Sequence, residues 1–330
     1  MWHTTVGLMV LLTLGVLGMP FAAAQQQTQT MPRIGVLTSG SLASDAAWIE
    51  AFRQGLRALG YVEGHSISIE YRYGEGKTER YPALVTELVQ RHVAVLVVGG
   101  ATATRAATQV TTRIPLVMAN VTDPVALGLV ASLARPGGNL TGVSNLAPEL
   151  GGKRLELLKE LVPQLARVAA LGDPSSPSHA PQWRETERAA RAFGVQVQAW
   201  EVREPHPDFA GAFAAITRSR ADALLTLAQP LIEVYQQQIV DFTVTRRLPA
   251  IFHRRGFVDA GGLMSYGANA ADLYRRAATF VDKILQGAQP AALPVEQPVK
   301  FDLIINLKTA KALGLTISPV LLFQATEVIQ

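Results

Sequence analysis

The chain has 330 residues and a formal net charge of +4, from 30 Lys+Arg and 26 Asp+Glu, an excess too small for the basic footprint of a nucleic-acid-binding protein. Hydrophobic residues make up 48% of the chain and charged residues 17%, which excludes an intrinsically disordered protein. The complete lack of cysteine excludes thiol catalysis, cysteine-bound zinc, iron–sulfur clusters, disulfides and an N-terminal lipid anchor.

The first 24 residues predict a secretory signal peptide. They contain no Asp, Glu, Lys or Arg, and an apolar run over 6–21 is followed by Ala22-Ala23-Ala24 and then by three glutamines. Such a run, ending in an A-x-A site, is typical of a signal peptide that is cleaved after Ala24. The alternatives are a buried helix and an uncleaved membrane anchor, although a membrane span needs about 20 apolar residues. We therefore expect an exported, periplasmic protein that consists of residues 25–330.

From residue 33 onward, strand-like and helix-like patterns alternate. Apolar strand-like runs in the first half lie at 33–37, 67–72, 93–98 and 114–118. Between them, apolar residues at helical spacing predict helices over 49–59 and 84–89. The continuous runs at 93–98 and 114–118 suit strands that are covered on both faces, as in a parallel sheet. Strands separated by helices of about 10–15 residues are typical of βαβ units.

The second half of the sequence repeats this plan. Its predicted strands lie at 167–171, 195–202, 223–227, 249–252 and 263–266. Its predicted helices lie at 183–193, 209–216, 232–245 and 273–284. The two halves are separated by Arg135-Pro-Gly-Gly-Asn139, which can continue neither a helix nor a central strand. We expect two α/β lobes rather than one sheet, since single cores rarely grow beyond about 250–300 residues.

Local motifs for catalysis, metal binding or nucleotide binding are absent. Gly76-Lys77-Thr78 resembles the end of a phosphate-binding loop, but Tyr71 stands where that loop needs a glycine. The sequence has no dinucleotide-binding glycine motif after a strand and no G-x-S-x-G nucleophile motif. Its six histidines form no i, i+4 pair. We therefore expect no enzyme, no cofactor and no metal site.

Small polar residues follow many of the predicted strands, at the carboxyl ends where open α/β sheets bind ligands. In the first half these candidates are Ser39, Gly100, Ala101, Thr102, Asn120, Thr122 and Asp123. In the second half they are Asp173, Gln229, His253, Arg254, Ser265 and Tyr266. A glycine at position 100 would let backbone N–H groups approach a ligand before the next helix begins.

Each of these candidates also has a purely structural interpretation. Asp123 precedes Pro124, so it is equally well explained as the cap of a helix that starts there. Tyr266 follows an apolar run and is equally well explained as a core tyrosine. We expect both side chains to lie in a cleft between the lobes.

Several longer motifs are shared with a known family. They are Asp123-Pro-Val125, Gly128-Leu-Val130, Arg135-Pro-Gly-Gly-Asn-Leu-Thr-Gly142, Gly152-Lys-Arg-Leu-Glu-Leu-Leu158, Gly261-Gly-Leu-Met-Ser-Tyr-Gly267, Tyr274-Arg-Arg-Ala-Ala278, Pro294-Val-Glu-Gln-Pro298 and the run from Phe301 to Leu315. Through them the chain resembles the ABC-transporter substrate-binding family related to tryptophan- and tyrosine-binding lipoproteins, over nearly all of residues 32–330.

The resemblance implies a type I periplasmic-binding-protein fold, in which two doubly wound parallel-sheet α/β lobes are joined by a hinge of three crossing segments. The implied limits are 1–24 for the signal peptide, 32–143 with 267–291 for the first lobe, and 144–266 with 292–330 for the second. The loops at 39, 100–102 and 122–123 would contact the ligand from the first lobe. Those at 173, 229 and 265–266 would face them from the second lobe.

The function implied by the resemblance is capture of a small molecule between the lobes and its delivery to an ABC permease in the inner membrane. Without cysteine the protein would not be a lipoprotein, and we expect a monomer that diffuses in the periplasm. The loop hydroxyls and N–H groups suit a carboxylate, and Tyr266 offers an aromatic face, so we expect an amino acid or a small carboxylate, aromatic ones included. A ligand-sensing module for a receptor and a flavodoxin-like enzyme are the alternatives.

Overall fold

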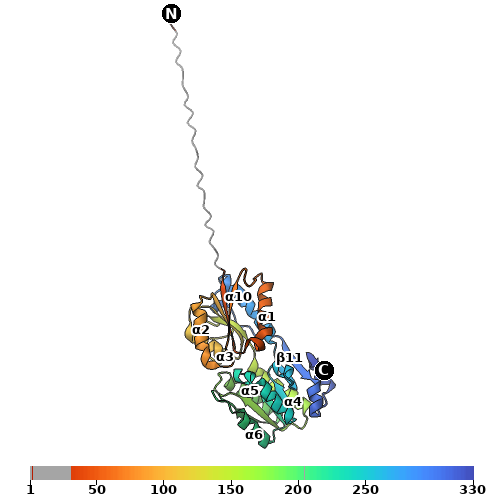
Figure 1. The fold of residues 1–330 in the computed structure, drawn as a ribbon. Helices are drawn as coiled ribbons and strands as arrows, with labels where there is room; N and C mark the ends of the chain where they lie inside the picture. Colours follow the sequence, from red (N-terminus) through yellow and green to blue (C-terminus); the bar gives the residue numbers. More distant parts are fainter. Residues whose placement is uncertain (1, 3–30, 204) are drawn as a thin grey trace. The chain divides into compact units, whose positions relative to one another are not determined.

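The computed structural model describes residues 2, 31–203 and 205–330, and the predicted signal peptide lies, except for residue 2, outside the described residues. Residues 31–330 form one compact unit, whose elements are drawn in Figure 1. Within the described part of the chain, no helix has the length and apolar character needed to cross a membrane.

The first lobe is built on a five-stranded parallel sheet. Its strands are β1 (Arg33–Thr38), β2 (Ser68–Tyr73), β3 (Val95–Gly99), β4 (Leu116–Val121) and β5 (Leu140–Ser144). They lie side by side in the order β2-β1-β3-β4-β5, with every pair parallel. The central strand β3 is buried along its whole length, as its continuous apolar run predicts.

Helices cover both faces of this sheet. They are α1 (Leu42–Ala58), the 3-10 helix η1 (Thr78–Arg80), α2 (Tyr81–Gln90), α3 (Ala101–Val110) and α10 (Ala270–Leu285). Val95 and Val97 of β3 pack in one apolar cluster with α1 and α10. Leu96 and Val98 pack in another cluster with α2 and α3. Helix α10 lies beside α1 (Figure 1), although more than 200 residues separate them in the sequence.

The second lobe is built on a seven-stranded sheet. Its strands are β6 (Arg167–Gly172), β7 (Gln196–Glu201), β8 (Ala223–Thr226), β9 (Ala250–Phe252), β10 (Met264–Ala268), β11 (Phe301–Asn306) and β12 (Glu327–Ile329). Their order is β12-β11-β10-β9-β8-β6-β7. Helices again cover both faces, because Val168 and Ala170 of β6 face one apolar cluster and Ala169 and Leu171 face another.

The helices of the second half complete this lobe. They are α4 (Ala147–Leu161), α5 (His179–Phe193), α6 (Phe209–Ser219), α7 (Pro230–Val234), α8 (Gln236–Thr245), α9 (Gly256–Asp259), α11 (Leu307–Leu313) and α12 (Pro319–Gln324). The predicted two-lobe, doubly wound α/β fold is confirmed.

One strand pair departs from the predicted parallel arrangement, because β10 and β11 are antiparallel. The chain leaves the second lobe after β10, forms α10 in the first lobe, and then returns. Since Phe301 at the start of β11 pairs with Ala268 at the end of β10, the chain re-enters the sheet at the end where it left. Strand β11 must therefore run in the opposite direction.

Three segments of residues 31–330 cross between the lobes: one between β5 and α4, one between β10 and α10, and one just before β11. The predicted lobe limits differ in detail from the observed sheets. The Val295 N–H donates to the Leu133 carbonyl (2.7 Å) and the Glu296 N–H to the Gly142 carbonyl (2.9 Å). These residues therefore lie along the first lobe, beyond the predicted limit at 291, while Ser144 belongs to β5 of the same lobe.

Candidate functional site

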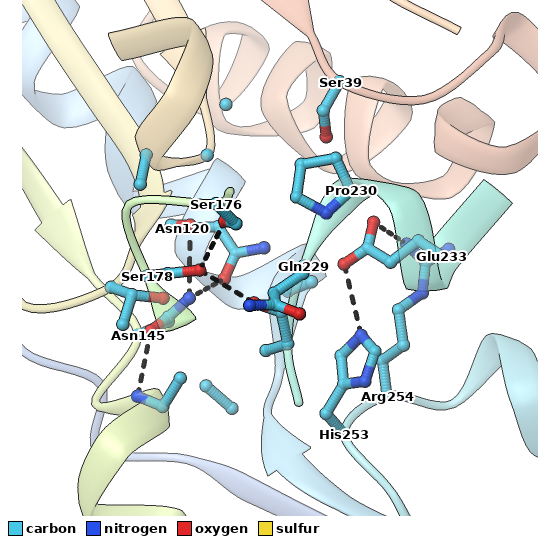
Figure 2. A pocket seen from close by; sticks show the side chains of 18 of the residues that line it. Ser39, Asn120, Asn145, Ser176, Ser178, Gln229, Pro230, Glu233, His253 and Arg254 are labelled. Atoms are coloured by element: carbon cyan, nitrogen blue, oxygen red, sulfur yellow. Dashed lines mark hydrogen bonds and ion pairs between the residues drawn. The ribbon is translucent and has the colours of Figure 1, made fainter. Parts of the chain in front are cut away.

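A cavity lies where the carboxyl ends of the strands of both sheets meet. It has a volume of about 60 Å³ and is partly open to solvent, which is smaller than the roughly 300–1,000 Å³ of small-molecule sites. Its lining includes residues that follow β1, β3, β4 and β5 in the first lobe and residues that follow β6, β8 and β9 in the second. Figure 2 draws 18 of the lining residues from close by and labels ten of them.

Six of the ten residues assigned to the site from the sequence line this cavity. They are Ser39, Gly100, Ala101, Thr102, Thr122 and Gln229. Asn120, His253 and Arg254, which also follow predicted strands, line it as well. The other four assigned residues, Asp123, Asp173, Ser265 and Tyr266, are not among the lining residues.

Asp123 closes a turn instead of starting a helix. The helix predicted from Pro124 does not form, and the following residues are turns and bends. The Ala126 N–H donates to Asp123 Oδ1 (3.0 Å). A single turn then ends at Gly128, which has a φ of +66°, a backbone conformation that glycine adopts without strain and that a continuing helix excludes.

The other three residues lie within the second lobe. Tyr266 packs against the core of that lobe and stacks on Phe301, with ring centroids 6.2 Å apart. Ser265 is 1% exposed inside β10. The Asp173 carboxylate accepts hydrogen bonds from the backbone and hydroxyl of Ser175. Whether any of the three contacts a ligand stays a prediction.

The N-terminus of α3 opens into the cavity. Gly100 has a φ of +84°, which turns the chain into the helix, and no side chain caps the helix there. The first N–H group of α3 that is hydrogen-bonded within the helix is that of Thr104, which donates to the Gly100 carbonyl (3.1 Å). The N–H groups of the helix's first turn therefore have no intrahelical acceptor. Together with the helix dipole they favour an anion.

Two asparagines tie the first crossing segment to the end of β4. The Asn145 side-chain amide donates to Asn120 Oδ1 (3.0 Å) and to the Asn120 carbonyl (3.2 Å), and Asn145 Oδ1 accepts from the Ala147 N–H (2.9 Å). Asn120 has a φ of +60°. This pair fixes the start of α4 against the first lobe (Figure 2).

A buried charged group lies on the second-lobe side of the cavity. Glu233 accepts hydrogen bonds from Arg254 (2.7 Å) and from His253 Nε2 (3.3 Å), as Figure 2 shows. Burial opposes ionisation of Glu233, but the charge of Arg254 and the hydrogen bond from His253 outweigh it and lower the Glu233 pKa. Burial lowers the His253 pKa to about 4, so His253 is neutral near pH 7.

An aromatic pair from the first lobe meets this group across the cleft. Trp48 of α1 stacks on Tyr274 of α10, with centroids 5.6 Å apart and an interplanar angle of 21°. The Arg254 guanidinium carbon lies 4.5 Å from the centroid of the Trp48 ring, within the range of a cation–π interaction. The two lobes are thus in direct contact beside the cavity.

Arg154 is the most unusual lining residue. It lies on the same face of α4 as Ala147 and Leu150, which also line the cavity, and it is 1% exposed. Its guanidinium makes one hydrogen bond to a described residue, from Nε to the Tyr266 carbonyl (2.8 Å). Burial lowers its pKa to about 10, so it carries a full charge near pH 7.

The sequence analysis missed several lining residues. Trp48, Arg154, Glu233 and Tyr274 lie on helices, Ser176 and Ser178 lie in the loop after β6, and Asn145 directly follows β5, a strand that was not predicted. For Arg154 a signal existed, since an arginine interrupts the apolar face of its helix. The described residues contain no group of three or more His, Cys, Asp or Glu side chains that could hold a metal ion.

Comparisons with known proteins agree with this geometry. The family model described as ABC transporter substrate binding protein matches residues 33–329. A tyrosine-binding protein of Clostridioides difficile is 25% identical over 272 residues, which cover 81% of this chain and 76% of that protein. A Streptococcus pneumoniae ABC domain in complex with L-Trp is 28% identical with a TM-score of 0.84, and the match covers 90% of this chain and 99% of that one. A conserved domain protein of Vibrio cholerae is 25% identical, again with a TM-score of 0.84, 90% of this chain and 99% of that one being covered.

Proposed function

We propose, since the chain belongs to the family of ABC transporter substrate-binding proteins, that it captures a small carboxylate or amino acid in the cleft and delivers it to an ABC permease in the inner membrane. The observation that carries this proposal is the cavity lined from both lobes, with the open N-terminus of α3 on one side and the buried Arg154 on the other. Relatives that bind tyrosine and L-Trp make aromatic ligands a natural part of the search.

Capture and release follow from the two-lobe architecture. Contacts that a ligand makes with both lobes exist only when the lobes are closed, so the ligand shifts the equilibrium toward the closed form. The Arg254–Trp48 contact adds a small closing force of its own. A permease that recognises the closed form would then distinguish loaded from empty protein.

The first experiment is a thermal-shift screen of amino acids, organic acids and aromatic compounds, followed by small-angle X-ray scattering with each hit. We expect the true ligand to raise the melting temperature and to reduce the radius of gyration. A tight ligand that leaves the radius of gyration unchanged would contradict capture between the lobes.

A matched pair of variants on α3 tests the placement of the site. Thr102 lines the cavity, whereas Thr108, two turns later, bonds through its hydroxyl to the Arg105 carbonyl. Loss of one hydrogen bond of about 0.5–1.5 kcal/mol should make Thr102→Val bind about 2- to 10-fold more weakly. Thr108→Val should keep the affinity of the unsubstituted protein, and equal effects of the two variants would place the site elsewhere.

We further propose that residues 1–24 direct export and that the protein acts as a periplasmic monomer, without a lipid anchor because it has no cysteine. Expression of the full chain, cell fractionation and N-terminal sequencing test this. We expect a mature N-terminus at Gln25 in the periplasmic fraction. A chain that keeps residue 1 and stays in the cytoplasm would refute export.

A further inference from the structure

The charge of the cavity lining is unbalanced. Its charged side chains are Arg154, Glu233 and Arg254. Glu233 and Arg254 form an ion pair (2.7 Å) and neutralise each other. His253, which also lines the cavity, is neutral near pH 7 because burial lowers its pKa to about 4. The lining therefore carries a net charge of +1, located on Arg154.

No described carboxylate compensates Arg154. It takes part in no ion pair with a described residue, and four of the five N–H donors of its guanidinium have no partner among them. A buried charge without a counter-ion is strongly unfavourable. A ligand anion supplied from outside the chain would remove this penalty.

The same lining offers little to an ammonium group. The two Glu233 carboxylate oxygens already accept from His253 and Arg254. Asp45, on α1, is within electrostatic range of Glu233 and Arg254, but it does not line the cavity. Its carboxylate accepts from the Gly40 N–H (3.0 Å) and the Ser44 hydroxyl (2.9 Å).

The amide oxygens of the lining are also engaged within the protein. Asn120 Oδ1 accepts from Asn145, Asn145 Oδ1 from the Ala147 N–H, and Gln229 Oε1 from the Asp173 N–H. The lining also carries the hydroxyls of Ser39, Thr102, Thr122, Ser176, Ser178 and Tyr274. Those of Ser176 and Ser178 bond to each other (3.0 Å), and the Ser178 hydroxyl donates to the Ala228 carbonyl (3.3 Å).

We infer that the preferred ligand is a monoanion, a carboxylic acid without an α-ammonium group such as a 2-hydroxy, 2-oxo or unsubstituted alkanoic or arylalkanoic acid, whose carboxylate pairs with Arg154. The inference rests on the proposed function and narrows its ligand class. A zwitterionic amino acid would leave the net charge of the lining unbalanced and would bring a second cation beside Arg154 and Arg254.

The test compares matched ligands that differ only at the α-carbon, measured by isothermal titration calorimetry on the purified protein. One series is L-phenylalanine, 3-phenyllactate, phenylpyruvate and 3-phenylpropionate, and the other is L-leucine, 2-hydroxyisocaproate and 4-methylpentanoate. In at least one series we expect an acid without the amine to bind at least tenfold more tightly than the amino acid. The corresponding carboxamide should lose at least tenfold against its carboxylate.

Two variants on one helix locate the carboxylate. Arg154→Gln should lose most of the preference for carboxylate over carboxamide, whereas Lys153→Gln, which removes a neighbouring cation that pairs with Glu156 and does not line the cavity, should keep it. If Arg154→Gln fails to fold, the ligand series on the unsubstituted protein decides alone.

The outcomes separate the inference from the proposed function. An amino acid that binds as tightly as all its counterparts overturns the inference and supports capture of amino acids. Closure of the lobes by a neutral ligand with no response to any carboxylate also overturns it. Absence of ligand-dependent closure across the whole screen overturns the proposed function as well.

Discussion

Lowering the pH should begin to destabilise this protein at about pH 6.5, before most carboxylates titrate, because one buried histidine must stay neutral in the folded state. His253 is bonded through Nδ1 to Thr226 and through Nε2 to Glu233, and burial lowers its pKa to about 4. An unfolded histidine has a pKa of about 6.5. Between these values the unfolded chain binds a proton that the folded chain does not, so stability is full above about pH 6.5 and falls as the pH drops toward 4. About 2.5 pH units at about 1.36 kcal/mol each amount to about 3 kcal/mol.

Three other buried or partly buried titratable groups change the pH dependence of stability by smaller amounts, each in the direction that its pKa shift sets. Burial also lowers the His179 pKa, which gives a loss in the same direction. The lowered pKa of Glu233 gives stability that is lost only below the ordinary range of a glutamate. Burial raises the Asp45 pKa, so its protonation offsets part of the loss. A comparison with a His253 variant isolates the histidine from these groups.

The assay is urea denaturation at pH 7.0, 6.0 and 5.0 for the unsubstituted protein, His253→Gln and His65→Gln. The unsubstituted protein should lose about 2 kcal/mol between pH 7.0 and 5.0, and the exposed control His65→Gln should follow it. His253→Gln should be less stable at pH 7.0 but lose less on acidification. If His253→Gln and the unsubstituted protein show the same pH dependence, the reasoning is refuted.

Three further variants test packing around the cleft. A Cβ on Gly99 would lie 2.1 Å from the Tyr274 hydroxyl oxygen, so Gly99→Ala should lower the free energy of unfolding by about 1–3 kcal/mol, measured by urea denaturation. Adding Tyr274→Phe should recover most of this loss. A double variant that recovers none of it would contradict the clash. Trp48→Leu removes the contact with Arg254, so the ligand-free protein should scatter as a more open molecule and ligand affinity should fall about 2- to 30-fold; an unchanged scattering curve would show that the contact does not hold the lobes. Tyr266→Ala should cost about 3–5 kcal/mol of stability and keep the ligand-induced thermal shift, and the reverse pattern would place its ring in the site.

Much of the fold was predictable because a strand that is buried on both faces has a continuous apolar sequence. The run that forms β3 is an example. The direction of β11 has no comparable sequence pattern. A strand's sequence does not record which end of a sheet the chain enters, and here that depended on α10 lying in the other lobe.

The site was predictable only where position along a strand was enough to define it. Gly100 and Thr122 line the cavity because they follow β3 and β4 directly. Ser265 and Tyr266 were placed at a strand end at residue 266, but β10 continues to Ala268, so both lie inside the sheet. An error of two residues in a strand boundary therefore changes whether a residue lines the cavity.

Lining residues that lie on helices could not be predicted from their position along a strand, and only one of them could be recognised from another sequence pattern. Most of them, such as Trp48, are amphipathic side chains that fit a helix surface equally well. Arg154 is different, since Leu150, Leu157 and Leu161 on its helix are buried and an arginine among them violates the apolar pattern. Positions where a local pattern is broken without compensation within the fold tend to be functional. At Arg154 the broken pattern, the burial and the missing counter-ion are all accounted for if the compensating charge belongs to the ligand.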